Sequence, residues 1–144
     1  MIEQDTIRLL RECDSGVKMG VTSIDEVMKY VKSPELRSYL EKGIEDNAII
    51  QKELEKLLDE YHDDGKEPNV MAKSMSWIKT NVKLAVNESD DKIADLMTEG
   101  CNMGVKSLSK YLNQYKAADE RSKNITERLI NIEERLAVDI RKFL

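Results

Sequence analysis

The sequence is poor in the residues that β-sheets and disulfide frameworks require. Its 144 residues include five Tyr, one Trp, one Phe, two Pro, two Cys and a single His. The scarcity of aromatic residues and the absence of alternating apolar and polar positions argue against β-strands. Two cysteines are too few for a disulfide scaffold and favour a reduced protein. We therefore predict an all-α protein.

Motifs of the common enzyme classes are also missing. There is no P-loop, no G-x-S-x-G and no zinc-type Cys/His spacing, so kinases, nucleotide-binding enzymes and hydrolases have no support. No catalytic motif is intact, which favours a non-catalytic protein over an enzyme. The net charge of −5 argues against a nucleic-acid partner, because binding phosphates requires a basic face.

Long apolar runs are absent as well. No stretch approaches the roughly 20 apolar residues of a membrane span. The N-terminal segment MIEQDTIRLLREC lacks the basic and apolar regions of a signal peptide. We therefore expect a cytoplasmic protein without a membrane partner.

Amphipathic helices account for what the sequence does contain. Charged residues make up 35% of the chain, and apolar residues recur at steps of three and four. Ser33 followed by Pro34 predicts a helix start, and Gly65 predicts a helix end. The pattern predicts one domain over residues 1–144, with helices over residues 2–31, 34–61, 68–86, 91–116 and 120–144.

Two distant segments are nearly alike and indicate an internal repeat. The sequence CDSGVKMG begins at Cys13 and CNMGVKSL begins at Cys101, 88 residues later. The same offset pairs Ile44-Glu45-Asp46 with Ile132-Glu133-Glu134. A fixed offset across whole elements is what duplication leaves. It predicts two helical hairpins, residues 2–61 and 91–144.

The segment between the hairpins predicts how they are connected. A helix over residues 68–86 would span about 28 Å, enough to return along the bundle. The second hairpin would then start at the end of the bundle where the second helix started. One long crossover of this kind is typical of ferritin-like four-helix bundles.

The chain resembles the ferritin-like superfamily, with relatives such as rubrerythrin and bacterioferritin, and is most similar to small bacterial ferritin-like domains of unassigned function. The resemblance extends from about Thr6 to Phe143. It is carried by the break at Ser33-Pro34-Glu35-Leu36-Arg37, Trp77 in the linker, Asp90-Asp91, and Glu99 to Gly104.

The resemblance implies a di-iron site in the core, and this sequence departs from it. In the family, two helices each give a carboxylate and two give Glu-x-x-His. By position the carboxylates fall near Asp14 and Asn102, and the other motifs fall around Glu45 and Glu133. No histidine follows either glutamate at the required spacing, and Asn102 is neutral. Iron or manganese is therefore not expected as a cofactor. An atypical oxygen site formed by Asp14, Glu45 and Glu133 stays open as the alternative.

Other interpretations of these polar residues are also open. Glu45, Glu133 and their acidic neighbours are expected to face water. Asn47 and Gln51 fall on the apolar stripe, where a buried amide needs a hydrogen-bond partner. Their partners would be each other, Asp14, Asn102 or trapped water. Asn47 and Asn102 thus join the three acids as remnant candidates for a metal site.

Small residues on the inner stripes form a further group, comprising Gly16, Gly20, Gly104, Cys13 and Cys101. The glycines predict a close approach of the first and fourth helices. The cysteines are expected to be buried hydrophobes, and a redox or soft-metal pair is the alternative.

His62, with Asp63 and Asp64, is expected to be solvated, with surface cation binding as the alternative. Trp77 and its Met neighbours predict packing of the linker helix or, alternatively, a partner-binding face.

Three functions follow from these features. The first is a non-catalytic ferritin-like bundle with a structural or protein-interaction role, as a homodimer or with another protein. The second is a metal-binding oxidase or storage protein that uses iron or manganese at an atypical carboxylate site. The third is a regulatory bundle in which a glycine-lined cavity holds a small molecule of unknown class.

Overall fold

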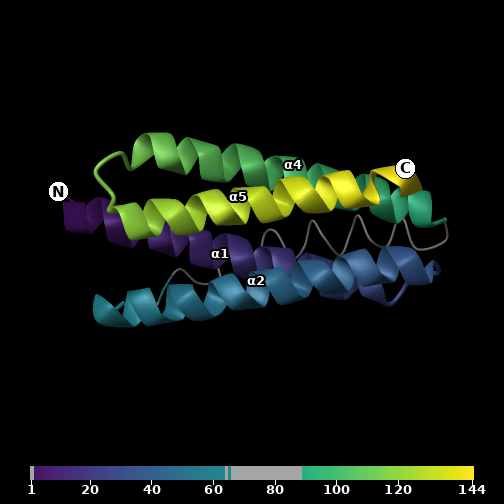
Figure 1. Ribbon diagram of the computed structural model, residues 1–144, viewed down its shortest axis with the longest axis horizontal. Coiled ribbons are helices and arrows are strands. Elements are labelled where there is room, and N and C mark those ends of the chain that lie inside the picture. Colours follow the sequence, from purple (N-terminus) through teal and green to yellow (C-terminus); the bar gives the residue numbers. More distant parts are fainter. Residues whose placement is uncertain (1, 64, 66–88) are drawn as a thin grey trace.

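The computed structural model describes residues 2–63, 65 and 89–144 (Figure 1). These residues form four long helices, α1 (Ile2–Met28), α2 (Pro34–Glu60), α4 (Asp90–Gln114) and α5 (Glu120–Ile140). A short 3-10 helix, η1 (Arg141–Phe143), follows α5, and no strand occurs in this part of the chain. The prediction of an all-α protein is confirmed. The predicted helix over residues 68–86, with Trp77, lies outside the described residues.

The turn between α1 and α2 forms where the sequence predicts it. Ser33 is extended and its hydroxyl accepts a hydrogen bond from the backbone N–H of Leu36 at 3.3 Å. Pro34 occupies the first turn, where a missing N–H leaves no hydrogen bond unmade. The carboxylate of Asp90 accepts from the backbone N–H groups of Lys32 and Ser33, at 2.9 and 2.8 Å. The start of α4 thereby fixes this turn.

The second helix ends within one residue of its predicted bound at 61, but the left-handed residue that follows it is not Gly65, the predicted stop signal. The last helical residue is Glu60, and His62 adopts a left-handed conformation with φ of 55°. The backbone N–H of Asp63 then returns to the carbonyl of Leu58 at 2.9 Å, which satisfies a carbonyl at the helix end. Gly65 also has a positive φ of 83°, but it lies beyond the turn that terminates the helix.

Neighbouring helices in the bundle are antiparallel. In Figure 1, α1 and α5 run in one direction and α2 and α4 run in the other. Contacts join α1 to α2, α4 to α5, α2 to α5 and α1 to α4. The end of α2 and the start of α4 lie at opposite ends of the bundle, so residues 61–89 connect the two ends. None of the described helices is long and apolar enough to cross a membrane.

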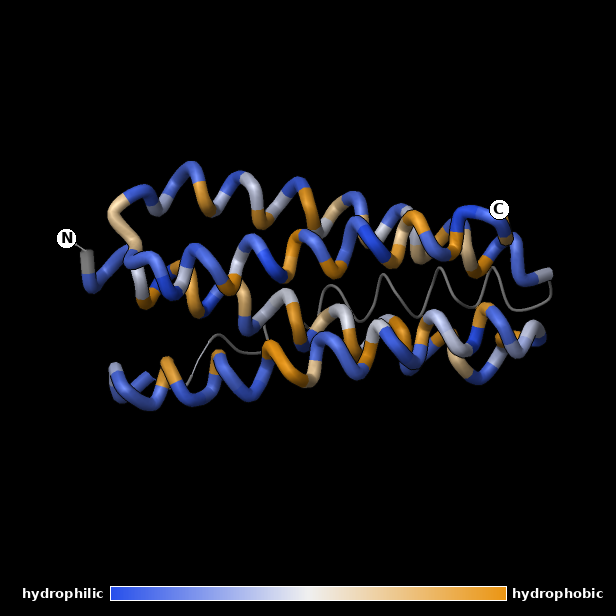
Figure 2. Tube along the Cα trace, viewed as in Figure 1, coloured by the Kyte–Doolittle hydropathy of each residue, from blue (hydrophilic) through white to orange (hydrophobic). Residues whose placement is uncertain are grey.

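Apolar residues on the inward sides of the helices form two separate core clusters (Figure 2). The first surrounds the α1–α2 turn and the start of α4, and comprises Ile24, Val27, Val31, Leu36, Leu40, Ile93, Leu96, Met97, Cys101, Leu136 and Ile140. The second surrounds the α4–α5 turn and the end of α2, and comprises Leu10, Cys13, Val17, Ile50, Leu54, Leu57, Leu58, Leu108, Ile125 and Leu129. Polar side chains lie between the two clusters, and these form the candidate site.

Candidate functional site

A layer of polar and glycine residues crosses the middle of the bundle, with one residue from each long helix. We call Gly20 of α1, Asn47 of α2, Gly104 of α4 and Glu133 of α5 the central polar layer. Each neighbours members of the two apolar clusters along its own helix. A polar group at this depth needs a partner, so the layer is the part of the core with chemistry to explain.

Asn47 is the most buried member of the layer, and its inward orientation confirms the prediction from the apolar stripe. Its residue is only 2% exposed. The amide nitrogen donates to the carbonyl of Gly43, one turn back on α2, at 2.7 Å. The side-chain oxygen Oδ1 is buried and has no hydrogen-bond partner among the described residues. A buried amide oxygen of this kind is a free acceptor aimed into the layer.

The carboxylate of Glu133 faces the same space as that oxygen. A Cβ atom added to Gly20 would lie 3.7 Å from Asn47 Oδ1 and 3.7 Å from Glu133 Oε1. A Cβ atom added to Gly104 would lie 3.6 Å from Glu133 Oε2. The two glycines of α1 and α4 therefore border the Glu133 side chain, which enters from α5.

This arrangement corrects two expectations about the glycines. Gly20 and Gly104 border the Glu133 side chain, which occupies the space that a ligand would need in a glycine-lined cavity. Gly16, which was expected to support close helix approach, has no atom of another described helix within 4 Å of the Cβ it lacks. Glu133 was expected to face water, and that expectation is wrong for its carboxylate.

The interior position of Glu133 changes its acidity. Burial removes water from the carboxylate and raises the pKa of Glu133 to about 7, although contact with the Cys101 thiol lowers it. Near neutral pH the group is therefore divided between a neutral acid and an anion. The neutral acid carries a hydrogen that an acceptor such as Asn47 Oδ1 can use.

Cys101 of α4 is the titratable group that contacts Glu133. It is buried, at 4% exposure, within the first apolar cluster. Burial raises the pKa of the Cys101 thiol, and the negative charge of Glu133 raises it further. The thiol therefore stays protonated next to the carboxylate.

Asp14 lies at a different level from the central polar layer. Its residue is 2% exposed, and its Oδ2 atom is 2.8 Å from Lys18 Nζ, one turn further along α1. Gly65, beyond the end of α2, packs directly against the Asp14 carboxylate. Asp14 and Gly20 are six residues apart, or about 9 Å along α1. The two inward acids of the remnant set therefore do not share one site.

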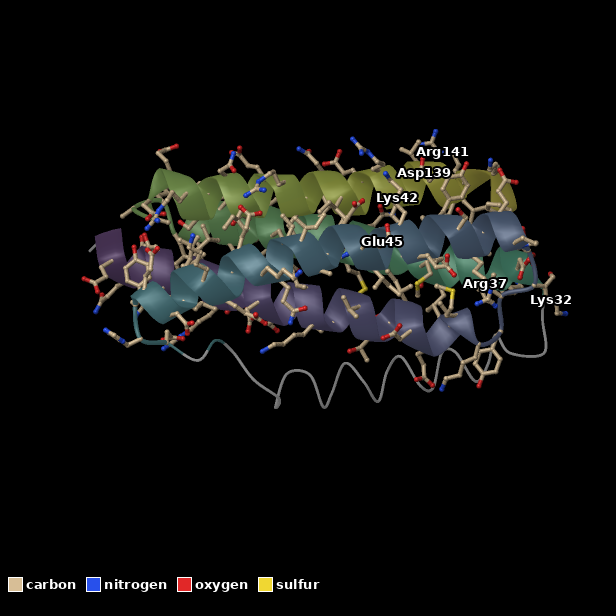
Figure 3. All side chains as sticks on the ribbon, turned by 60° about the horizontal axis from the view of Figure 1, so that its bottom comes forward. Lys32, Arg37, Lys42, Glu45, Asp139 and Arg141 are labelled. Carbon is tan, nitrogen blue, oxygen red and sulfur yellow. The ribbon has the colours of Figure 1, made fainter. Side chains whose placement is uncertain are left out.

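The remaining residues of that set face outward. Glu45 lies on the outer surface of α2 (Figure 3) and is exposed, as is Asn102 on α4. Gln51, the second amide on the stripe of α2, is only partly buried. Within the described residues, no three His, Cys, Asp or Glu side chains converge to hold a metal ion. Of the five remnant candidates, the fold brings together only Asn47 and Glu133.

The two cysteines are both buried, as the sequence predicts, but they belong to different apolar clusters. Cys13 Sγ lies 3.1 Å from Thr126 Oγ1 on α5. Burial raises the pKa of Cys13 to about 12, an effect that the Thr126 contact opposes. This placement favours two inert core thiols over a redox or soft-metal pair.

Both thiols are expected to resist alkylation in the folded protein. At pH 8, iodoacetamide should modify neither Cys13 nor Cys101 within the time that labels both in urea, because the reactive thiolate is scarce and shielded. Intact-mass spectrometry after quenching counts the modified thiols. Rapid double modification without denaturant would contradict the burial of these residues.

The turn after α2 contains the only histidine of the sequence, and the acid described beside it, Asp63, is paired. His62 is exposed. The carboxylate of Asp63 instead pairs with Arg11 of α1, whose Nε lies 3.0 Å from Oδ1, and this pair lowers the pKa of Asp63. Asp63 also accepts from the backbone N–H of Gly65 at 2.9 Å. Asp64 lies outside the described residues. These contacts favour a role for Asp63 in fixing the turn over cation binding with His62.

Comparison of the chain with known proteins found no relative. No family model matches the chain, and neither a curated protein nor a solved structure matches it.

Proposed function

We propose that the protein is a ferritin-like bundle without a complete di-iron ligand set, and that it has a structural or protein-interaction role. The observation that carries this proposal is the composition of the central polar layer. It contains one carboxylate, from Glu133, and one amide, from Asn47, while Glu45 and Asn102 are exposed.

The arrangement of the helices supports the ferritin-like part of the proposal. The end of α2 and the start of α4 lie at opposite ends of the bundle, as in bundles with one long crossover. The first helices of the two hairpins begin at Ile2 and Asp90, which are 88 residues apart, the same offset as between the two C-[D/N]-x-G-V-K segments. This agreement supports an origin by duplication.

A di-iron centre does not fit the residues of the layer. Two metal ions in such a bundle require carboxylates from four helices and two imidazoles. Here two of the four positions in the layer are glycines, and the single histidine lies in the exposed turn after α2. One carboxylate whose pKa is raised by burial supplies too little negative charge for two divalent ions. We therefore derive no oxidase chemistry for this layer.

A single hard cation, such as manganese or ferrous iron, is the second candidate. One observation favours it: Asn47 Oδ1 is buried without a partner and faces the same space as Glu133 Oε1. Amide and carboxylate oxygens are suitable ligands for such ions. The protein would then be an atypical metal-binding member of the same fold.

Metal analysis separates the two candidates. The untagged protein is grown with added iron and manganese, dialysed and examined by elemental mass spectrometry alongside Glu133→Gln and the exposed control Glu134→Gln. We expect no metal at stoichiometric amounts in any of the three proteins. One ion per chain that is lost in Glu133→Gln and retained in Glu134→Gln would establish the second candidate. Two ions per chain would overturn the proposal altogether.

A further inference from the structure

Charged side chains bridge α2 and α5 at regular intervals along the seam between these helices. Arg128 pairs with Glu53 through two bonds of 2.8 and 2.9 Å, and Arg121 lies 3.0 Å from Glu60. At the other end, Lys142 of η1 pairs with Glu35 and donates to the hydroxyl of Tyr39 at 3.1 Å. Glu53 and Glu60 on α2 are seven residues apart, as are Arg121 and Arg128 on α5, and Tyr39 and Lys142 lie fourteen residues from Glu53 and Arg128. The same side of each helix therefore faces the seam.

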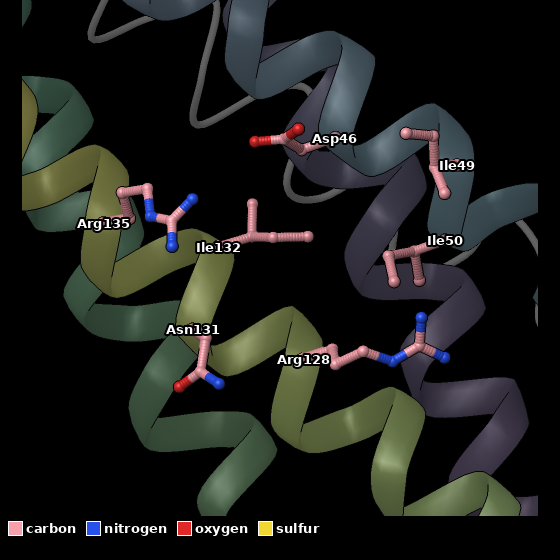
Figure 4. A pocket seen from close by; sticks show the side chains of 7 residues that line it. All are labelled: Asp46, Ile49, Ile50, Arg128, Asn131, Ile132 and Arg135. Atoms are coloured by element: carbon pink, nitrogen blue, oxygen red, sulfur yellow. The ribbon is translucent and has the colours of Figure 1, made fainter.

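One bridge of this series is open. The position between Glu53 and Tyr39 on α2 is Asp46, and its counterpart between Arg128 and Lys142 on α5 is Arg135. Neither residue makes a hydrogen bond or ion pair with any described residue. They face one another across a groove of about 320 Å³ (Figure 4), whose other lining residues include Ile49, Ile50 and Ile132.

The groove has apolar residues and unpaired charges of both signs at its surface. Ile49 on α2 is 61% exposed, and Val138, one turn beyond Arg135 on α5, is 53% exposed. One turn from Asp46, α2 carries Lys42, and one turn from Arg135, α5 carries Asp139 (Figure 3). These two residues also make no ion pair with the described part of the chain. On each helix, therefore, one cation and one anion are available to a partner.

We propose that the α2–α5 groove is a homodimer interface in which Asp46 of each copy pairs with Arg135 of the other. A two-fold axis parallel to the seam places α2 of one copy over α5 of its partner. Asp46 then meets Arg135, and Lys42 meets Asp139, so all four charges in each half of the interface are matched. A perpendicular axis at the level of Asp46 and Arg135 would instead place Asp46 over Asp46 and Arg135 over Arg135, which is unfavourable.

The apolar residues provide the second component of this interface. Ile49 and Val138 would leave water on association, together with the part of Ile132 that lines the groove. The inference deepens the proposed interaction role by identifying the partner as a second copy of the chain. The alternative occupant is the chain itself, with Arg135 reorienting to pair with Asp46 of the same molecule.

Mixing two charge-reversal variants distinguishes these occupants. Asp46→Arg and Arg135→Asp are examined by sedimentation velocity over a range of micromolar concentrations, each alone and then as an equimolar mixture. We expect the native protein to dimerise and each variant alone to do so at least about tenfold more weakly, because like charges then meet across the interface. In the mixture, one chain offers two cations and the other two anions, so a heterodimer of native affinity should form.

Matched reversals outside the groove control for general charge effects. Asp95→Arg and Lys110→Asp alter exposed residues of α4 and should leave dimerisation unchanged, alone or mixed. A native protein that stays monomeric over the whole range would overturn the proposal, as would a dimer that none of the groove variants weakens. Failure of the mixture to restore association would identify an ion pair within one chain. None of these outcomes alters the metal analysis, so the proposed function is tested separately.

Discussion

At pH 8, Glu133→Gln is expected to be more stable to urea than the native protein by about 2 to 3 kcal/mol. The native chain must either keep a carboxylate ionised between Gly20 and Gly104 or bind a proton that is scarce at this pH. Glutamine has nearly the same shape and carries no charge. Its amide also adds a hydrogen-bond donor to the space that Glu133 shares with Asn47 Oδ1, the acceptor that has no partner among the described residues.

The pH dependence of this difference has a definite sign. The folded pKa of Glu133, about 7, lies above the ordinary value of 4.5 that the unfolded chain is expected to have. The stabilising effect of protonation is therefore complete below about pH 4.5 and is lost as the pH rises towards 7. The free energy of unfolding of the native protein should approach that of Glu133→Gln at pH 4.5. It should then become progressively lower than that of the variant up to about pH 7. Above pH 7 the difference should stay constant.

Urea unfolding followed by circular dichroism at several pH values measures this profile. Glu134→Gln, which alters the exposed neighbour, is the matched control and should track the native protein throughout. A constant difference between Glu133→Gln and the native protein across this range would show that the carboxylate titrates as a solvated group. The account of the central polar layer would then be wrong.

The second large effect is expected in the apolar cluster next to the α4–α5 turn. Leu54→Ala should lower the free energy of unfolding by about 3 kcal/mol, the middle of the range for a leucine removed from a packed core. Leu54 is fully buried in the cluster that includes Ile50 and Leu129. Loss of its side chain would leave a cavity that helices on all sides can close only in part.

The same substitution at the surface provides the comparison. Leu144 is 58% exposed, so Leu144→Ala should change stability by less than about 0.5 kcal/mol. Both values are obtained from urea unfolding at pH 5, where Glu133 is largely protonated and contributes little to the difference. Similar losses at both positions would contradict the two-cluster description of the core.

Much of the architecture could be predicted from local patterns. The start of α2 after Ser33 is set by a capping hydroxyl and a proline, both of which act within one turn. The steps of three and four place Asn47 on the inner side of its helix, and the structure confirms it there. The end of α2 was predicted to within one residue, but the residue that stops it was not, because His62 adopts a left-handed conformation that usually indicates glycine.

The sequence alone therefore determined that the protein is helical, where most helices begin and which stripe of each is apolar, because these properties depend on residues within a few turns. It also contained a signal for Glu133, which lies four residues after Leu129 and three before Leu136 on the inner stripe. Ile132, the residue before Glu133, fits the same inner stripe and is the more hydrophobic of the two. Only tertiary packing resolves the choice, since the Glu133 side chain lies against glycines on two other helices.

Contacts between the helices likewise decided which charges are paired. The spacing of seven between Arg121, Arg128 and Arg135 is visible in the sequence. Their partners are set by the register of α2 against α5, in which Glu53 meets Arg128. That register depends on side-chain packing across the whole seam, and no segment of either helix encodes it alone. The fold therefore decided that Asp46 and Arg135 face each other across the groove without an ion pair.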